Sequence, residues 1–122
     1  MALSLSTPFA DVGTIHAEQT DATATADTLK GSSGTLHKVE IDNTANTAAV
    51  FVKMWDTAGG VTVGTTAPSY AFKCAASSLR VYSCPRGAAF TAGLKVACVT
   101  DGGGTAGDTS PTNDVIYRIL LS

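Results

Sequence analysis

Alternation between apolar and polar residues at every second position is the feature that most constrains the fold of this chain. In the run LHKVEID, His37, Val39 and Ile41 fall on one face and charged residues fall on the other. The runs VFVKMW at residues 50–55 and YAFKC at residues 70–74 alternate in the same way. A period of two is that of a β-strand, because successive side chains of a strand point to opposite faces. Each of these runs is therefore predicted to be a half-buried strand.

Clusters of turn-forming residues separate the alternating runs. NTAN links residues 36–42 to residues 50–55, and AASS links residues 70–74 to residues 79–84. Asn and Ser favour tight turns, so both pairs of strands are predicted to form hairpins. The sequence PRG, with its fixed Pro and free Gly, is predicted to be another turn. Further short strands are expected at residues 61–64, 88–93 and 94–100.

The run VIYRILL at residues 115–121 differs from the other strands because both of its faces are apolar. Only Arg118 interrupts the apolar residues. A strand of this kind is poorly suited to an exposed edge, where it would invite pairing with other chains. We therefore expect it to lie centrally in a sheet, covered by a second sheet or by a partner subunit.

The spacing of these segments indicates the fold class. About seven to eight short antiparallel strands, with turn signals roughly every 8 to 12 residues, are typical of a β-sandwich or jelly roll. The 122 residues have the length of one domain. We predict an all-β protein with a single β-sandwich domain at residues 34–122. Residues 1–33, rich in Ala and Thr without sustained alternation, are predicted to be an extended N-terminal arm or extra strands.

Charge and hydropathy argue against two classes of partner. The net charge is −2, and eight Lys and Arg residues are scattered along the chain. No basic stripe is present that could neutralise nucleic-acid phosphates, so nucleic-acid binding is disfavoured. No run approaches the roughly 20 apolar residues of a membrane helix, and the opening residues lack the pattern of a signal peptide. The chain is therefore expected to fold in the cytosol where it is made, with no membrane partner.

The loop at residues 101–114 contains the sequence GGGTAG, which matches the GxGxxG pattern of dinucleotide-binding turns. That function needs a helix directly after the glycines, because the N–H groups of its first turn bind the pyrophosphate. Here Ser110 and Pro111 lead into a predicted strand, so we interpret the segment as a surface loop. Its aspartates do not follow the spacing of a known Ca²⁺ loop. No cofactor and no metal are predicted.

The cysteines and histidines show no ligand or catalytic spacing. Cys74, Cys84 and Cys98 lack a CxxC arrangement, and buried free thiols are the expected state. His16 and His37 are not close in sequence to a cysteine or to each other, and His37 is expected to be a satisfied core or interface residue. Pairs of groups for general acid and base catalysis cannot be identified either. The protein is therefore predicted not to be an enzyme.

Aromatic side chains on the predicted strands have two interpretations. Trp55, Tyr70 and Tyr117 could form a platform that stacks on sugars, or they could make core or subunit contacts. Single aromatic residues on strands more often pack against protein. The candidate interface that the sequence indicates consists of Trp55, Tyr70, Tyr117, Ile119 and Leu121.

Several phrases between residues 36 and 122 resemble a group of small virion proteins of tailed bacteriophages. The phrases are IDNTAN, TVGTTAP and the Gly-rich and Thr-rich loop that runs into SPTNDV. The resemblance implies a structural protein of the virion, made in the cytoplasm of the host bacterium. It also implies a capsid cement or decoration protein that stabilises the head shell, a homotrimer, and the major capsid protein or other virion proteins as partners.

The same resemblance leaves an alternative position in the particle. Other small β-rich proteins of this kind belong to the tail, the neck or the fibres, and a fibre protein could carry a glycan-binding module. If the cement interpretation is correct, we expect deletion of residues 1–30 to weaken attachment to the shell more than folding, because an arm gains its order on assembly.

Overall fold

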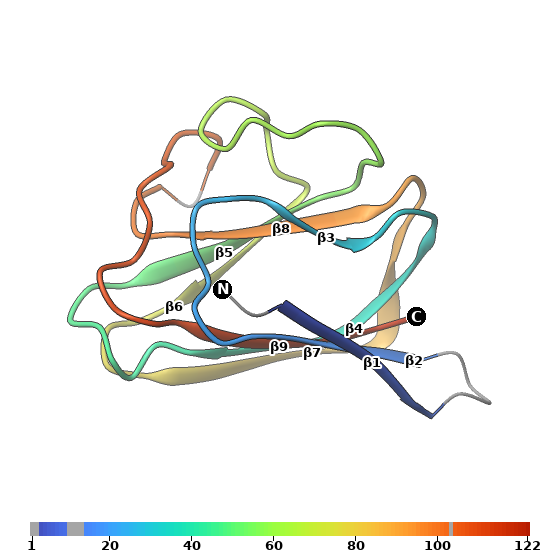
Figure 1. The fold of residues 1–122 in the computed structure, drawn as a ribbon, viewed down its shortest axis with the longest axis horizontal. Helices are drawn as coiled ribbons and strands as arrows, with labels where there is room; N and C mark the ends of the chain where they lie inside the picture. The colour runs from blue at the N-terminus through green and yellow to red at the C-terminus, as the bar shows by residue number, and fades with distance from the viewer. Residues whose placement is uncertain (1–2, 10–13, 103) are drawn as a thin grey trace.

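The computed structural model describes residues 3–9, 14–102 and 104–122, and within them the chain forms two packed antiparallel β-sheets (Figure 1). This confirms the predicted all-β class. The described part contains no helix and therefore none that could cross a membrane. The nine strands are β1 (Leu3–Phe9), β2 (Thr14–Gln19), β3 (Asp27–Lys30), β4 (Gly34–Asp42), β5 (Val50–Trp55), β6 (Tyr70–Cys74), β7 (Leu79–Phe90), β8 (Leu94–Val99) and β9 (Ile116–Leu121).

The two sheets differ in size and form the two layers seen in Figure 1. The five-stranded sheet has the order β1-β2-β9-β4-β7, and the four-stranded sheet has the order β3-β8-β5-β6. The chain repeatedly crosses between the layers, since β3, β5, β6 and β8 belong to one sheet and β4, β7 and β9 to the other. Neighbours within each sheet are therefore mostly distant in sequence.

The core lies between the sheets and consists of the inward-facing residues of the alternating runs. From the five-stranded sheet, Val39 and Ile41 of β4 and Ile119 of β9 are fully buried. From the four-stranded sheet, Val52 of β5 and Val96 of β8 meet them. Burial of apolar area at about 25 cal/mol per Å² is the main stabilising contribution to such a two-layer fold.

Strand β9 lies in the middle of its sheet, as its two apolar faces predict. It pairs with β2 on one side and with β4 on the other, both antiparallel. Tyr117, Ile119 and Leu121 face the core, while Arg118 and Leu120 lie on the outer face and are half-buried. The four-stranded sheet of the same chain covers the inner face, so no partner subunit is needed there.

Both predicted hairpins are wrong. Strands β4 and β5 belong to different sheets, and so do β6 and β7. The rings of Phe72 in β6 and Tyr82 in β7 are in contact, with centroids 5.1 Å apart, but this contact joins the two sheets at their edge. Alternation shows which face of a strand is buried, but it does not show which strand is its neighbour.

The NTAN segment forms a junction between three connections instead of a hairpin turn. Asn43 is buried and donates from Nδ2 to the carbonyl oxygens of Ala48 (2.9 Å) and Ala75 (3.0 Å). Asn46, also buried, donates to Asn43 Oδ1 (3.0 Å) and to the carbonyl oxygen of Asn113 (3.1 Å). These buried amides thus tie the crossing chain segments together through their backbone carbonyls.

Of the two alternatives for residues 1–33, an arm or extra strands, the described residues form strands. β2 lies between β1 and β9, and β3 pairs with β8. Ala17 of β2 and Leu29 of β3 belong to the core. The sandwich therefore includes these strands as well as residues 34–122, and β1 is its outermost part.

Two further local predictions are corrected by the structure. Residues 61–64 lie in a loop and not in a strand. The PRG sequence lies inside the long strand β7, where residues 84–87 sit opposite His37 alone. The extra residues form a bulge, and Gly87 adopts a φ of 76° within it. Pro and Gly occur at bulges within strands as well as in turns, so the PRG sequence alone does not distinguish the two.

Aromatic side chains close the side of the sandwich where β6 and β7 form the sheet edges. The Tyr70 hydroxyl, from one sheet, donates to the Ala89 carbonyl of the other (3.1 Å). The Tyr82 hydroxyl makes the reverse link to the Lys73 carbonyl. Two tyrosines thus join the layers from opposite directions, with the Phe72 ring between them.

Candidate functional surface

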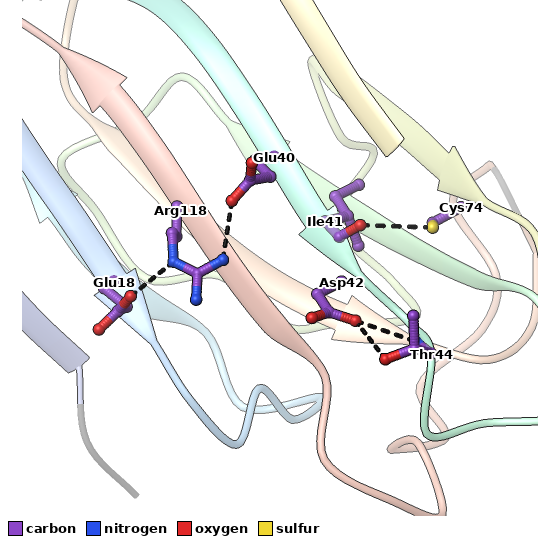
Figure 2. A network of polar contacts seen from close by, with 7 residues as sticks. All are labelled: Glu18, Glu40, Ile41, Asp42, Thr44, Cys74 and Arg118. Atoms are coloured by element: carbon purple, nitrogen blue, oxygen red, sulfur yellow. Dashed lines mark hydrogen bonds and ion pairs between the residues drawn. The ribbon is translucent and has the colours of Figure 1, made fainter. Parts of the chain in front are cut away.

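The outer face of the five-stranded sheet carries a row of charged residues across three strands (Figure 2). Arg118 of β9 lies between Glu18 of β2 and Glu40 of β4, which are its direct partners in the strand register. Its Nε donates to Glu18 Oε2 (2.7 Å) and its Nη1 to Glu40 Oε2 (2.8 Å). The hydrogen bonds that Arg118 donates to Glu40 and Glu18 raise the pKa of its guanidinium. The row holds the three central strands together and leaves no uncompensated charge on Arg118.

Two shallow hollows adjoin this row on the same outer face. The larger, of about 410 Å³, is lined by His37, Lys38, Ser83, Cys84, Pro85 and Leu120. The smaller, of about 120 Å³, is lined by His16, Lys38, Glu40, Arg118 and Leu120. They share Lys38 and Leu120, and the bulge of β7 forms one wall of the larger hollow.

The larger hollow brings a thiol and an imidazole to one surface, but the geometry does not join them. His37 Nε2 is 2.9 Å from the Ser122 hydroxyl oxygen, which satisfies the ring as expected. Cys84 is half-buried and free. A thiol nucleophile needs a base within hydrogen-bond reach and a third group that orients that base. In the described residues no three His, Cys, Asp or Glu side chains form a metal-binding group either.

The remaining two cysteines are inside the molecule. Cys74 and Cys98 are buried, which agrees with the expected buried thiols, and all three cysteines are free. Cys74 Sγ is 3.6 Å from the Ile41 carbonyl oxygen, so it links β6 to β4 of the other sheet (Figure 2). Burial raises the pKa of Cys74 and raises that of Cys98 to about 12. Both thiols are thus held in their unreactive protonated form.

Two long loops cover the outer face of the four-stranded sheet (Figure 1). Trp55 lies below the loop after β5 and donates from Nε1 to the Thr66 carbonyl (2.9 Å). Lys53 lies below the loop after β8, and its Nζ donates to the carbonyl oxygens of Ala106 (2.7 Å) and Gly107 (3.2 Å). Burial lowers the pKa of Lys53, and the carboxylates of Asp101 and Asp108 partly oppose that shift.

The glycines of the GxGxxG-like segment build this loop. Gly102 and Gly107 have φ values of 68° and 106°, a region that favours glycine. A Cβ at Gly107 would lie 1.9 Å from the Asp101 carbonyl oxygen, so the loop needs glycine there. The segment then continues to β9 without a helix, which confirms the interpretation as a surface loop.

Four of the five residues of the predicted interface lie inside the molecule. Trp55 is 2% exposed and Tyr117 is 1% exposed, and Ile119 and Leu121 are fully buried. Their side chains pack within this chain and are not available to a partner. Tyr70 is half-buried at the side of the sandwich. Apolar and aromatic residues on a strand predict a covering layer, and here that layer belongs to the same chain.

The same burial corrects the proposed sugar platform. Trp55 and Tyr117 cannot stack on a ligand, because their rings are covered. They also lie on different sheets, so they do not share a face with each other.

Where side chains are described, the large apolar ones that are exposed lie on the two edge strands of the five-stranded sheet. Leu5 of β1 is 50% exposed, Leu79 of β7 is 51% exposed and Val81 of β7 is 42% exposed. Alternation placed Leu79 and Val81 on one face of a strand, but it did not show that this face points outward. Leu5 lies in the segment without sustained alternation, so no local pattern indicated that its side chain would be exposed.

Comparisons of the chain with protein-family models, with curated proteins and with solved structures found no match.

Proposed function

We propose that this protein is a structural component of a tailed-bacteriophage virion, acting as a cement or decoration protein on the head shell. Its partners would be the major capsid protein and further copies of itself, with a trimer as the number that the sequence resemblance implies. Cementing requires a rigid body with adhesive surface and no catalytic group. The proposal combines the resemblance within residues 36–122 with the surface described above.

The observation that carries the proposal is the location of the exposed apolar side chains. Leu5, Leu79 and Val81 lie on edge strands, where a sheet is most open to added protein. In contrast, Arg118 and Lys53 are held by bonds within the chain. A chain with this distribution is suited to binding other proteins through the edges of its sheets.

Quantitative mass spectrometry of purified particles tests the proposal. A cement protein should be present in many copies, in proportion to the major shell protein. A few copies per particle would place the protein in the tail, neck or fibre, which is the alternative position. Absence from particles would contradict both positions.

A glycan array separates the fibre alternative from the cement proposal. The suitable variant is Tyr70→Ala and not Trp55→Ala, because Trp55 is covered whereas Tyr70 is half-buried. A cement protein should give no sugar signal with either the wild type or the variant. A signal that Tyr70→Ala removes would favour a glycan-binding fibre module.

A further inference from the structure

We propose that β1 pairs with β1 of a second copy of this chain, which would join two five-stranded sheets into one continuous sheet. The proposal goes beyond the proposed function and departs from the trimer that the sequence resemblance implies, because a two-fold contact makes a dimer. The contact itself concerns the purified chain alone.

Strand β1 has a free edge. Among the described strands it pairs with β2 alone, and it is the outermost strand of its sheet (Figure 1). An edge strand presents unpaired N–H and C=O groups that can pair with another chain. Such addition of a strand is a common mode of protein recognition.

One side of β1 also lacks a covering layer. Leu5 is the direct partner of Ala17, which is fully buried, so Leu5 lies on the core side of the sheet. The four-stranded sheet nevertheless leaves Leu5 50% exposed. A leucine that points to the core side of a sheet but remains half exposed needs further apolar cover, which an additional strand beside β1 would bring.

The other sheet edges are better protected than β1. Strand β3 spans only Asp27–Lys30, so it offers a short edge. The tyrosine and phenylalanine side chains described above close the side formed by β6 and β7. In β1, by contrast, residues 3–6 keep a regular register with β2 and contain no charged residue or proline that would discourage pairing, since Pro8 and the register shift of this strand come after Ser6.

The sequence of β1 favours a second copy as the occupant. A two-fold axis through the strand midpoint and normal to the sheet gives antiparallel pairing and keeps the core sides of both copies together. Centred on Leu5, it places Leu5 beside Leu5 of the partner subunit and Ser4 beside Ser6 of the partner subunit. Leu5 then meets its own copy on the core side, and serine hydroxyls meet serine hydroxyls on the outer side. No like charges oppose each other.

The experiment is the mass of the purified chain in solution by light scattering, over a range of concentrations. We expect a dimer of twice 12.4 kDa that dissociates on dilution. Leu5→Lys should make the chain monomeric, because it places a charge on each side of the two-fold axis. Val81→Lys is the matched control on the opposite edge of the same sheet, and it should remain dimeric.

A second measurement does not depend on a substitution. Hydrogen exchange of the amides of residues 3–6 should slow as the protein concentration rises, while the amides of β7 should not respond. A monomeric wild type, or a dimer that Val81→Lys dissociates and Leu5→Lys does not, would overturn the proposal. A trimer would also overturn the two-fold pairing, yet it would agree with the proposed function, so the two can fail separately.

Discussion

At the scale of single residues, the buried polar groups are the most informative. Gln19 is fully buried and donates from Nε2 to Asp27 Oδ2 (3.1 Å). Lys53 is fully buried on the other sheet and is held by two loop carbonyls. The Tyr117 hydroxyl, in contrast, is buried without a hydrogen-bond partner among the described residues. A buried polar group with hydrogen-bond partners is compatible with a stable fold, whereas one without a partner lowers the free energy of unfolding.

Tyr117→Phe should increase the free energy of unfolding by about 1 kcal/mol, because it removes a buried hydroxyl that lacks a partner and keeps the ring. Urea denaturation of the two proteins at neutral pH measures the difference. Burial raises the pKa of Tyr117, so the hydroxyl is neutral under these conditions. A loss of stability of similar size would show that the hydroxyl is bonded, for example to an internal water.

Lys53 gives a prediction about pH. Its pKa in the folded protein is lowered by burial from the ordinary value of 10.5, so the unfolded chain holds more protons between the two values. Stability rises with pH wherever the unfolded state binds more protons. The wild type should therefore gain stability relative to Lys53→Met as the pH rises toward 10.5. Parallel slopes of the two unfolding free energies against pH over this interval would refute the prediction.

At the scale of strands, the bulge of β7 is the feature that sets the shape of the outer face. It places residues 84–87 opposite His37 alone and forms one wall of the larger hollow. Gly87 has a φ of 76°, and a Cβ there would lie 2.1 Å from Cγ2 of Thr35. The bulge therefore depends on glycine for its conformation and for its close approach to β4.

Gly87→Ala should destabilise the protein by about 1 to 3 kcal/mol, through strain at a positive φ and the clash with Thr35. Gly60→Ala is the matched control, because a Cβ at Gly60 meets nothing within 4 Å. Thermal unfolding of both variants measures the difference. If the two substitutions cost the same, the conformation of the bulge is not what requires glycine.

The strands also show what the sequence could and could not predict. The period-two runs located β4, β5, β6 and β9 to within about two residues, because burial of one face determines the pattern. The neighbours of these strands in the sheets were not predictable. A strand with one buried face has the same sequence pattern whichever strand lies beside it.

The candidate surface was less predictable than the strands. Trp55 and Tyr117 are aromatic residues of the kind that interfaces contain. A loop of the same chain covers Trp55, and the second sheet covers Tyr117. The exposure of Leu5 arises because the five-stranded sheet extends beyond the four-stranded one. That difference in width is a property of the tertiary structure and leaves no trace in local sequence.

At the scale of the whole molecule, the N-terminal strands are integral to the sandwich. β2 supplies a neighbour for β9, and β3 supplies a neighbour for β8. Leu29 and Ala17 belong to the shared core. The expectation that residues 1–30 serve attachment more than folding therefore needs revision, because most of this segment is part of the folded body.

Two truncations test this division of the N-terminal region. A chain without residues 1–30 should lose cooperative unfolding, because β9 loses a hydrogen-bonding neighbour and the core loses Leu29. A chain without residues 1–9 should remain folded, since it loses only an outer strand. Circular dichroism with thermal melts reads out both. Cooperative melting of the shorter chain near the wild-type temperature would contradict the assignment.

The central position of β9 also determines when the sheet can form during synthesis. β2 and β4 hydrogen-bond to β9 on its two sides. Neither can form these hydrogen bonds until β9 is synthesised, almost a hundred codons after β2. As a nascent chain leaves the ribosome, its early strands emerge with unmatched edges and with a half-built interior. The five-stranded layer can close only after residues 116–121 have cleared the exit tunnel, so a stalled or prematurely terminated product lacks its middle and is exposed to aggregation.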